Sequence, residues 1–465
     1  MNVKRSLLYE IGERLRTWIT SSKIQKVESR NYVYAKEGKN TLMNEYIIGI
    51  DIGSSNICAA AGKVDKHAGV QIMGITSSNC TGVKRGIVVD IDNTSESIKK
   101  CINSLERMLD TKISEAYISL PGGISEIIWN KGVVAVSSED REIKQNDVKR
   151  VLKASKIITV PNDKEIIGVI PEQYIIDGYD KIKDPIGMSG LRLEVDSQII
   201  MAQSAIVNNI FKSVNKAGIK VLGVVFQPIA ISEVVLKEDE IQRGVALVDA
   251  GAESINIYIY EGGNLRSIST IGLGGNIITN DIGVCLKLSA SEAEKLKIKY
   301  GSLEINHDEE NFKIEVDADY NNKVKVDYNI LVQIIQARVE ELFSIIDREI
   351  RNSEYYDKLS GVVMVGGGMA AINGIEKFGE SVLKKLVRIG VPKYIGAASP
   401  MYATAVGVVK DVSNSIKVKN AAFTDPIKNK DICDYEETDQ EEKTSKKNKD
   451  SSFVSRIKQF FTDFF

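Results

Sequence analysis

Histidine, proline and clustered cysteine are scarce in this chain of 465 residues. It has two histidines, His67 and His307, and eight prolines. Its five cysteines are Cys58, Cys80, Cys101, Cys285 and Cys433, and no two of them form a Cys-x-x-Cys pair. Because a zinc site or a disulfide framework needs clustered ligands, the sequence favours scattered thiols in a reducing cytosol. It also argues against catalysis by a histidine base, since neither histidine lies near a recognisable motif.

An excess of either charge and a long apolar run are also lacking. The 61 Lys and Arg residues nearly balance 63 Asp and Glu residues, for a net charge of -2. A dedicated nucleic-acid binder usually shows a basic excess, so we expect no nucleic-acid partner. No segment approaches the ~18 consecutive apolar residues of a spanning helix. The remaining composition is typical of a globular protein long enough for two or more domains.

Residues 1–45 are predicted to be an extension in front of the first domain. Met43-Asn44-Glu45 leads directly into the first predicted strand, as a natural start would. On this interpretation residues 1–42 lie outside the native protein. The alternative is a basic amphipathic helix over residues 1–20, which alternates basic and apolar residues. The segment lacks the compact apolar core and cleavage site of a secretory signal.

A strand–Asp–x–Gly–turn–strand pattern occurs twice in the chain. The strand at 46–51 ends in Asp51, and a turn containing Gly53 leads to the strand at 56–64. The strand at 244–249 ends in Asp249, and a turn containing Gly251 leads to the strand at 255–260. This repetition predicts two related halves that face a cleft. A third apolar strand, 361–365, runs into Gly366-Gly367-Gly368.

Glycine-bearing turns after apolar strands can present backbone N–H groups to phosphate oxygens. The two aspartates would hold Mg²⁺ through waters, because magnesium keeps part of its hydration shell. The triple glycine would pack flat against a purine. Glu294 and Lys297, one turn apart on a predicted helix, could reach the ribose or base, or could simply form a solvated charged face. The candidate nucleotide-binding residues are Asp51, Gly53, Ser54, Ser55, Asp249, Gly251, Ser254, Glu294, Lys297, Gly366, Gly367 and Gly368.

Other stretches predict further parts of the protein. Short strands and one helix between 122 and 200 favour a small α+β domain inserted into the first half. The acidic, then lysine-rich composition of 411–450 cannot bury a core, so we expect a disordered linker. The expected layout is 46–121 with 201–236 as the first half, 122–200 as the inserted domain, and 237–410 as the second half with a helical subdomain at about 285–350.

The last fifteen residues, 451–465, read SSFVSRIKQFFTDFF and are strongly amphipathic at helical spacing. Such a helix would lie in a membrane interface, with basic side chains attracted to anionic lipids. Docking onto the globular body is the alternative. A single tail should bind modestly, and several tails on one polymer far more firmly. The predicted membrane-binding residues are Phe453, Val454, Arg456, Ile457, Lys458, Phe460, Phe461, Phe464 and Phe465.

Three motifs resemble those of the actin/Hsp70/sugar-kinase superfamily: GIDIGSSN (49–56), GVALVDAGAESINI (244–257) and GVVMVGGGMAAINGI (361–375). Within it, the chain resembles the FtsA family of bacterial cell-division proteins. The segment VIPEQYIIDGYDKIKDPIGMSGLRLEVDSQII (169–200) is specific to that family and ends the inserted domain that replaces an actin subdomain. The resemblance implies an α/β, actin-like ATPase fold of two related halves around a nucleotide cleft.

The resemblance also implies a function. It predicts an ATP- and Mg-binding adaptor, with weak or absent ATPase activity, that polymerises on the cytoplasmic face of the membrane at the division site. The adaptor would tether FtsZ filaments by binding the FtsZ C-terminal peptide at Arg338, and later division proteins through the inserted domain. Alternatives are a diverged paralogue, a pilus-assembly actin homologue or a sugar/acetate-type kinase. A soluble kinase would have no use for the phenylalanine-rich tail.

Two residues depart from the family pattern. Relatives usually carry Gly-Gly-Gly-Thr where this chain has Gly251-Ala252-Glu253-Ser254. We therefore expect the Glu253 carboxylate close to the phosphates, where it would weaken ATP binding or hydrolysis. Asn56 stands where many relatives have lysine, so the first turn has no phosphate-contacting lysine.

Overall fold

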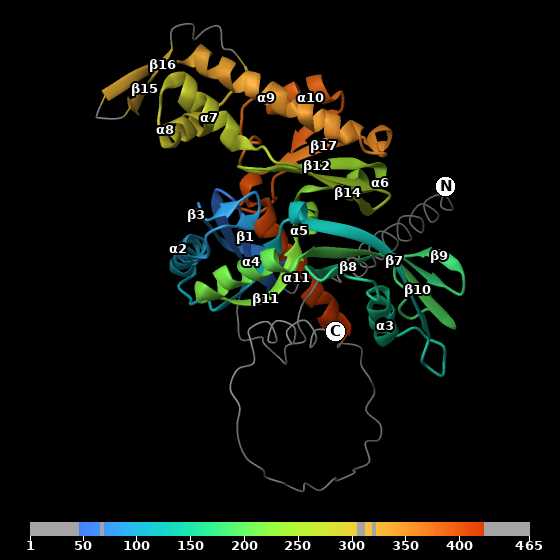
Figure 1. The fold of residues 1–465 in the computed structure, drawn as a ribbon. Coiled ribbons are helices and arrows are strands. Elements are labelled where there is room, and N and C mark those ends of the chain that lie inside the picture. Colours follow the sequence, from blue (N-terminus) through green and yellow to red (C-terminus); the bar gives the residue numbers. More distant parts are fainter. Residues whose placement is uncertain (1–45, 66–68, 305–311, 319–321, 423–465) are drawn as a thin grey trace, which may run out of the picture.

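The computed structural model describes residues 46–65, 69–304, 312–318 and 322–422 (Figure 1). The predicted N-terminal extension, most of the predicted linker and all the predicted membrane-binding residues lie outside these ranges. Among the described residues, no helix is both long enough and apolar enough to cross a membrane.

The first half is built on a five-stranded sheet in the order β11-β6-β1-β2-β3. The pairs β1–β2 and β2–β3 are antiparallel, whereas β6 and β11 run parallel with β1. Helices α2 (Ile91–Leu109) and α4 (Ser204–Lys216) pack together beside this sheet, and α5 is Gln227–Val235. The strands are β1 (Ile47–Ile52), β2 (Asn56–Asp65), β3 (Gly69–Asn79), β6 (Glu115–Leu120) and β11 (Lys220–Phe226).

The second half repeats this sheet with the same order and the same strand directions. Its order is β14-β13-β12-β17-β18, with antiparallel pairs at one end and parallel pairs at the other. Helices α6 (Glu238–Arg243) and α10 (Ile375–Leu383) lie beside it. The two related halves predicted from the repeated motif are therefore present. The strands are β12 (Val245–Ala250), β13 (Ile255–Glu261), β14 (Asn264–Ile271), β17 (Gly361–Val365) and β18 (Leu386–Ile389).

A subdomain projects from the second half, at the top of Figure 1. It contains α7 (Gly275–Leu286), α8 (Ala290–Tyr300), α9 (Tyr328–Arg351) and a hairpin of β15 (Lys313–Ala318) and β16 (Asn322–Asp327). Asp327 caps α9 by accepting hydrogen bonds from two backbone N–H groups. The subdomain thus begins ten residues before the predicted position 285, and it is not purely helical.

The inserted domain is a second small α+β unit, on the right of Figure 1. Its four antiparallel strands follow the order β7-β10-β8-β9. Helix α3 (Gln145–Ser155) packs on β7 and β10 and closes a separate apolar core. The strands are β7 (Ser125–Ala135), β8 (Lys164–Ile176), β9 (Tyr179–Ile182) and β10 (Arg192–Gln203).

The last described helix, α11 (Ala403–Ala422), corrects two predicted boundaries. It packs on β1, β2 and α5, so it belongs to the first half and not to the second. Glycines allow this close crossing: a Cβ atom on Gly49 would lie 2.7 Å from the Ala405 carbonyl oxygen, and one on Gly407 would lie 2.0 Å from that of Ala230. The linker predicted from residue 411 cannot begin there, because α11 continues and Val412 is only 1% exposed.

Candidate nucleotide site

The two predicted phosphate turns share one backbone geometry. In the β1–β2 turn the Gly53 N–H donates to the Asn56 carbonyl oxygen at 3.1 Å. In the β12–β13 turn the Gly251 N–H donates to the Ser254 carbonyl oxygen at 2.9 Å. Asp51 and Asp249 hold the same register, each next to last in its strand. The sequence repeat therefore corresponds to a repeated structure at the edge of each half.

The two aspartates come from opposite halves and influence each other. Asp51 accepts a hydrogen bond from the Ser119 hydroxyl at 2.7 Å, and burial raises its pKa to about 6. Asp249 is 8% exposed, and burial together with the charge of Asp51 raises its pKa to about 7. Two desolvated carboxylates with mutual repulsion are stabilised by a cation. Oxygen donors of this kind suit Mg²⁺ that keeps its waters and binds phosphate.

Gln227, at the start of α5, connects the halves beside these aspartates. Its Nε2 donates to Asp249 Oδ2 at 3.2 Å. Its Oε1 accepts from the Tyr258 hydroxyl at 3.0 Å and from the Gly122 N–H at 3.4 Å. The sequence reasoning missed Gln227 and Ser119, because each stands alone at the end of an apolar strand and has no motif around it.

Two of the three glycines in the triple glycine are needed for close contacts within the protein's own backbone. The Gly368 N–H donates to the Ala250 carbonyl oxygen at 2.8 Å. A Cβ atom on Gly368 would lie 2.1 Å from the Gly251 carbonyl oxygen, and Gly366, at φ +92, has equally little room. Around Gly367 no atom lies closer than 3.5 Å to such a Cβ. Of the three glycines predicted to face a purine, Gly367 is therefore the one where a Cβ atom would fit, in ordinary contact with the Met401 side chain.

Lys297 lies in a buried network instead of on a solvated charged face. Its ammonium donates to the Gly275 carbonyl oxygen at 3.1 Å and to the Thr279 hydroxyl at 2.8 Å, and it pairs with Glu294 at 2.7 Å. Burial lowers the pKa of Lys297. A Cβ atom on Gly275 would lie 2.4 Å from the Gly368 carbonyl oxygen, so this network supports the loop beside the triple glycine. Glu294 is the more exposed member of the pair.

Glu253 does not project freely toward the predicted phosphate position. Its Oε1 accepts from the Lys84 ammonium at 3.0 Å, and its Oε2 accepts from the Arg85 N–H at 3.1 Å. Both donors lie on the small hairpin of β4 (Val83–Lys84) and β5 (Ile87–Val88) in the first half. The sequence reasoning missed this hairpin, since nothing in its residues indicates a contact 168 positions away.

Arg338, the predicted partner-binding residue, lies on α9 in the projecting subdomain. Its guanidinium pairs with Asp281 of α7, with one Nη2–Oδ1 distance of 3.1 Å, and with Glu341 one turn along α9. The side chain is 24% exposed. Arg338 thus joins two helices as well as presenting a partly accessible cation.

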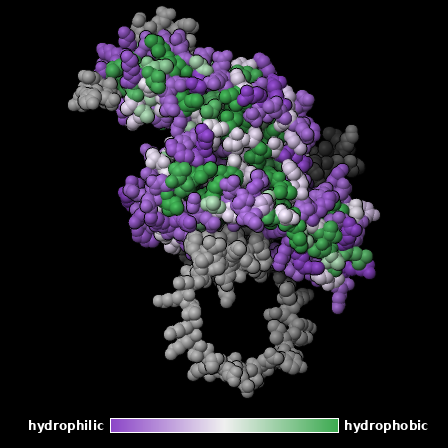
Figure 2. Space-filling view, viewed as in Figure 1, coloured by the Kyte–Doolittle hydropathy of each residue, from purple (hydrophilic) through white to green (hydrophobic). Residues whose placement is uncertain are grey.

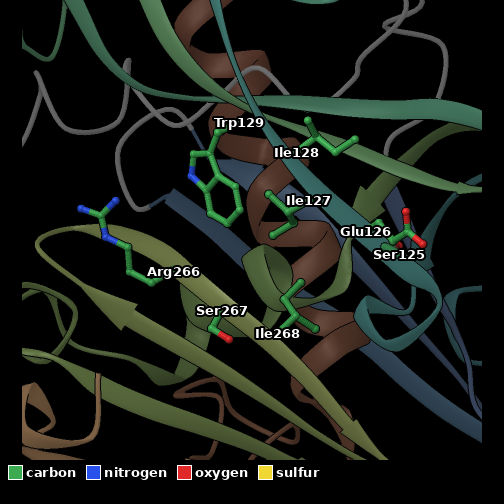
Figure 3. Close-up of a pocket in the computed structure, with 8 residues that line it drawn as sticks. All are labelled: Ser125, Glu126, Ile127, Ile128, Trp129, Arg266, Ser267 and Ile268. Atoms are coloured by element: carbon green, nitrogen blue, oxygen red, sulfur yellow. The ribbon is translucent and has the colours of Figure 1, made fainter. Parts of the chain in front are cut away.

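A separate hollow of about 430 Å³ lies between the edge strands β7 and β14 (Figure 3). Trp129 and Arg266 line it from opposite sides, and no predicted nucleotide-binding residue is among its lining residues. Beside it, Glu172 accepts hydrogen bonds from Arg266 at 3.1 Å, from Gln198 at 2.6 Å and from the Trp129 indole at 3.3 Å. This network fastens the inserted domain to the second half.

Comparison with known proteins identifies the family. The family model "Cell division protein FtsA" matches residues 246–407, and "SHS2 domain inserted in FTSA" matches residues 122–201. The cell division protein FtsA of Bacillus subtilis (strain 168) is 36% identical over 377 residues, which cover 81% of this chain and 85% of that protein. The chain belongs to the FtsA family of cell division proteins.

A further relative supports the family, and solved structures support the fold. The FtsA protein of Neisseria meningitidis serogroup B is 32% identical, over 78% of this chain and 89% of its own length. A PilM-PilN type IV pilus biogenesis complex matches with a TM-score of 0.54 at 15% identity, over 79% of this chain and 98% of that one. The structure of MreB5 of Spiroplasma citri bound to ADP matches with a TM-score of 0.51 at 13% identity, over 81% of this chain and 99% of that one. The predicted actin-like fold with an inserted domain is confirmed.

Proposed function

We propose that this FtsA-family protein binds ATP with Mg²⁺ between its two halves and tethers FtsZ filaments to the cytoplasmic face of the membrane at the division site. The observation that carries the nucleotide part is the pair Asp51 and Asp249. These carboxylates come from opposite halves. Burial raises the pKa of both, and the charge of Asp51 further raises the pKa of Asp249. An ion that bridges them to phosphate would offset both effects.

The residues around the pair suggest how the nucleotide is held. The two aspartates would hold Mg²⁺ through waters, and the ion would neutralise phosphate charge. The turns at Gly53 and Gly251 would give N–H groups to the phosphates, with the hydroxyls of Ser54, Ser55 and Ser254 beside them. The purine would pack at Gly367, and the ribose would lie toward Glu294.

Membrane attachment is proposed for residues 451–465, on the sequence pattern alone. The described chain ends at residue 422, so 423–450 would supply the reach between α11 and the amphipathic segment. The phenylalanines would enter the lipid interface, and Arg456 and Lys458 would favour anionic lipid. Self-association would bring several such segments to one surface and strengthen attachment.

Two surfaces are proposed for partners. The FtsZ C-terminal peptide would bind near Arg338, where an acidic peptide would compete with Asp281 and Glu341 for the guanidinium. Later division proteins would dock on the inserted domain, over which apolar side chains gather at the lower right of Figure 2. Three apolar side chains of the inserted domain are more than half exposed: Trp129 at 54%, Leu191 at 57% and Ile157 at 82%.

A reconstitution on vesicles tests the adaptor function. Full-length protein with Mg-ATP should bring a fluorescent protein carrying an FtsZ C-terminal peptide to anionic vesicles. Deletion of 451–465 should abolish recruitment without lowering the melting temperature, because that segment lies beyond the described fold. The matched pair Arg456→Glu with Lys458→Glu should weaken binding to anionic vesicles only, and less so at high salt. Equal co-sedimentation of the truncated and full-length proteins would refute the proposed anchor.

A further inference from the structure

The hairpin of β4 and β5 has an unusual position at the phosphate end of the cleft. Its tip is the two-residue turn Arg85-Gly86, with both φ angles positive at 50 and 79. Such turns reverse the chain tightly and match the twist of the flanking strands. The tip therefore forms a rigid projection from the first half.

The tip contacts the phosphate turns of both halves. The Gly86 N–H donates to the Ser54 hydroxyl at 3.4 Å, within the first half. Lys84 and the Arg85 N–H bind the Glu253 carboxylate, which belongs to the second half. A Cβ atom on Gly272 would lie 3.5 Å from the guanidinium carbon of Arg85, so this cation also lies against the second half.

The chemistry around Glu253 resembles that around a bound phosphate oxygen. One carboxylate accepts hydrogen bonds from a lysine ammonium and a backbone N–H, and the guanidinium of the same hairpin lies beside Gly272 of the second half. Ammonium, guanidinium and backbone N–H groups are the donors that bind phosphate in proteins. The Glu253 side chain is 17% exposed and the Lys84 side chain 61% exposed, so the lysine can move while the acid is held. Because Asn56 occupies the usual lysine position of the first turn, the hairpin brings the positive charge that the turn lacks.

We propose that Lys84 and Arg85 bind phosphate in the nucleotide site, through the Lys84 ammonium, the Arg85 N–H and the Arg85 guanidinium, and that Glu253 occupies the first two donors until the terminal phosphate of a nucleoside triphosphate displaces its carboxylate. The proposal rests on the proposed function, since it requires a nucleotide between the two turns. A triphosphate reaches the hairpin and a diphosphate, one phosphate shorter, does not. The exchange therefore makes the site prefer ATP over ADP and opens the contact between Glu253 and the first half.

Calorimetric titration of the full chain with Mg-ATP and with Mg-ADP tests this assignment. Replacement of both cations, Lys84→Ala with Arg85→Ala, should weaken Mg-ATP binding about tenfold or more, the equivalent of ~1.4 kcal/mol. Mg-ADP affinity should change far less. Glu253→Gln, which retains a hydrogen-bond acceptor and removes the charge, should tighten Mg-ATP binding several-fold. The control is Lys112→Ala, which removes one exposed lysine charge from a pair with Glu106 outside the site. This variant should change neither affinity.

The combined variant distinguishes displacement from simple repulsion. Without Lys84 and Arg85, Glu253→Gln should no longer tighten ATP binding, because no cations remain to be released. An equal gain with and without the two cations would mean that Glu253 repels the phosphate directly, and would overturn the proposal. Unchanged ATP affinity of the Lys84/Arg85 variant would overturn it as well, and the single variant Lys84→Gln covers the case of a double variant that fails to fold, because Lys84 is the cation paired with Glu253. A wild-type protein that binds no Mg-ATP would instead refute the proposed function.

Discussion

The first and second phosphate turns have the same backbone but differ in how the protein supports them. The first turn carries hydroxyls at Ser54 and Ser55 and has one side-chain hydroxyl tied to the β4–β5 hairpin. The second turn carries Glu253 and is locked to neighbouring backbone: the Gly275 N–H donates to the Gly251 carbonyl oxygen at 2.9 Å, and the Gly368 N–H to that of Ala250 at 2.8 Å.

Because the two turns are supported differently, they have different structural roles in the two halves. Backbone hydrogen bonds and glycines that tolerate no Cβ atom make the second turn a fixed platform. The first turn has one backbone hydrogen bond to a neighbouring segment, from the Cys80 N–H to the Ser55 carbonyl oxygen at 2.8 Å, and its contact with the hairpin is made by the Ser54 hydroxyl, which another ligand can replace. A fold repeat thus keeps the aspartate and the turn in place while the surrounding side chains provide different functions. The variants below separate the platform from the exchangeable contacts.

The largest effect is expected from a methyl group in the platform. Gly368→Ala would place its Cβ atom 2.1 Å from the Gly251 carbonyl oxygen, so backbone must shift, at a cost of about 1–3 kcal/mol or more. Gly367→Ala has room and should leave the melting temperature almost unchanged, while it weakens ATP binding if the purine packs there. Differential scanning calorimetry, without and with Mg-ATP, measures the melting temperature of each variant and the stabilisation by ATP. Equal melting temperatures for the two variants would show that the backbone around Gly368 can shift to accept a Cβ atom at no cost in stability.

Removal of one aspartate should affect nucleotide binding and apo stability in opposite directions. Asp249→Asn keeps an acceptor for Gln227 and removes a desolvated charge that repels Asp51. The nucleotide-free protein should therefore melt at a higher temperature, and most of the increase caused by Mg-ATP should vanish. Asp51→Asn should behave alike but with a smaller gain, since its pKa is raised less, to about 6. A full Mg-ATP shift in Asp249→Asn would contradict a role for this carboxylate.

The raised pKa values also predict a pH dependence. Between about pH 4 and 7 the folded protein binds more protons at Asp51 and Asp249 than the unfolded chain does. Stability of the nucleotide-free protein should therefore fall as pH rises through this window. Mg-ATP needs the ionised carboxylates, so its stabilising shift should grow from pH 5.5 to 7.5.

The variant Asp249→Asn is the control for this pH dependence, because other groups of the protein titrate in the same pH range. Burial lowers the pKa of Lys156 to about 7, and its contribution is common to both proteins. The difference in stability between wild type and variant should change between pH 5 and 8 and level off above it. A difference that stays constant over that range would place the titration elsewhere.

The smallest effect concerns Arg338, in the subdomain that only the second half carries. Charge reversal would put a third carboxylate beside Asp281 and Glu341, so Arg338→Glu should lower stability by roughly 0.5–1 kcal/mol. Arg338→Gln removes the charge without this repulsion, and both variants should bind the FtsZ peptide more weakly in fluorescence anisotropy. Wild-type affinity in Arg338→Gln would exclude Arg338 from the peptide site.

The parts that were predictable from sequence are those encoded by local pattern. The alternation around Asp51 and Asp249 specifies strand, turn and strand within about fifteen residues, and both hairpins form as expected. The contacts of Gln227, Lys84 and Glu253 were not predictable, because they join segments far apart in sequence and no local pattern indicates which partner each side chain meets. The assignment of α11 to the wrong half has the same origin: its apolar residues show that it packs, but not on which sheet.

Hydrogen exchange with and without Mg-ATP tests the central claim, that nucleotide binds between the two halves, without altering any residue. The account predicts that saturating Mg-ATP slows exchange together in 52–57, in 249–255 and in 366–369, and leaves β7 of the inserted domain unchanged. Slower exchange in only one of the two halves, or at the hollow between β7 and β14 in place of the turns, would contradict it.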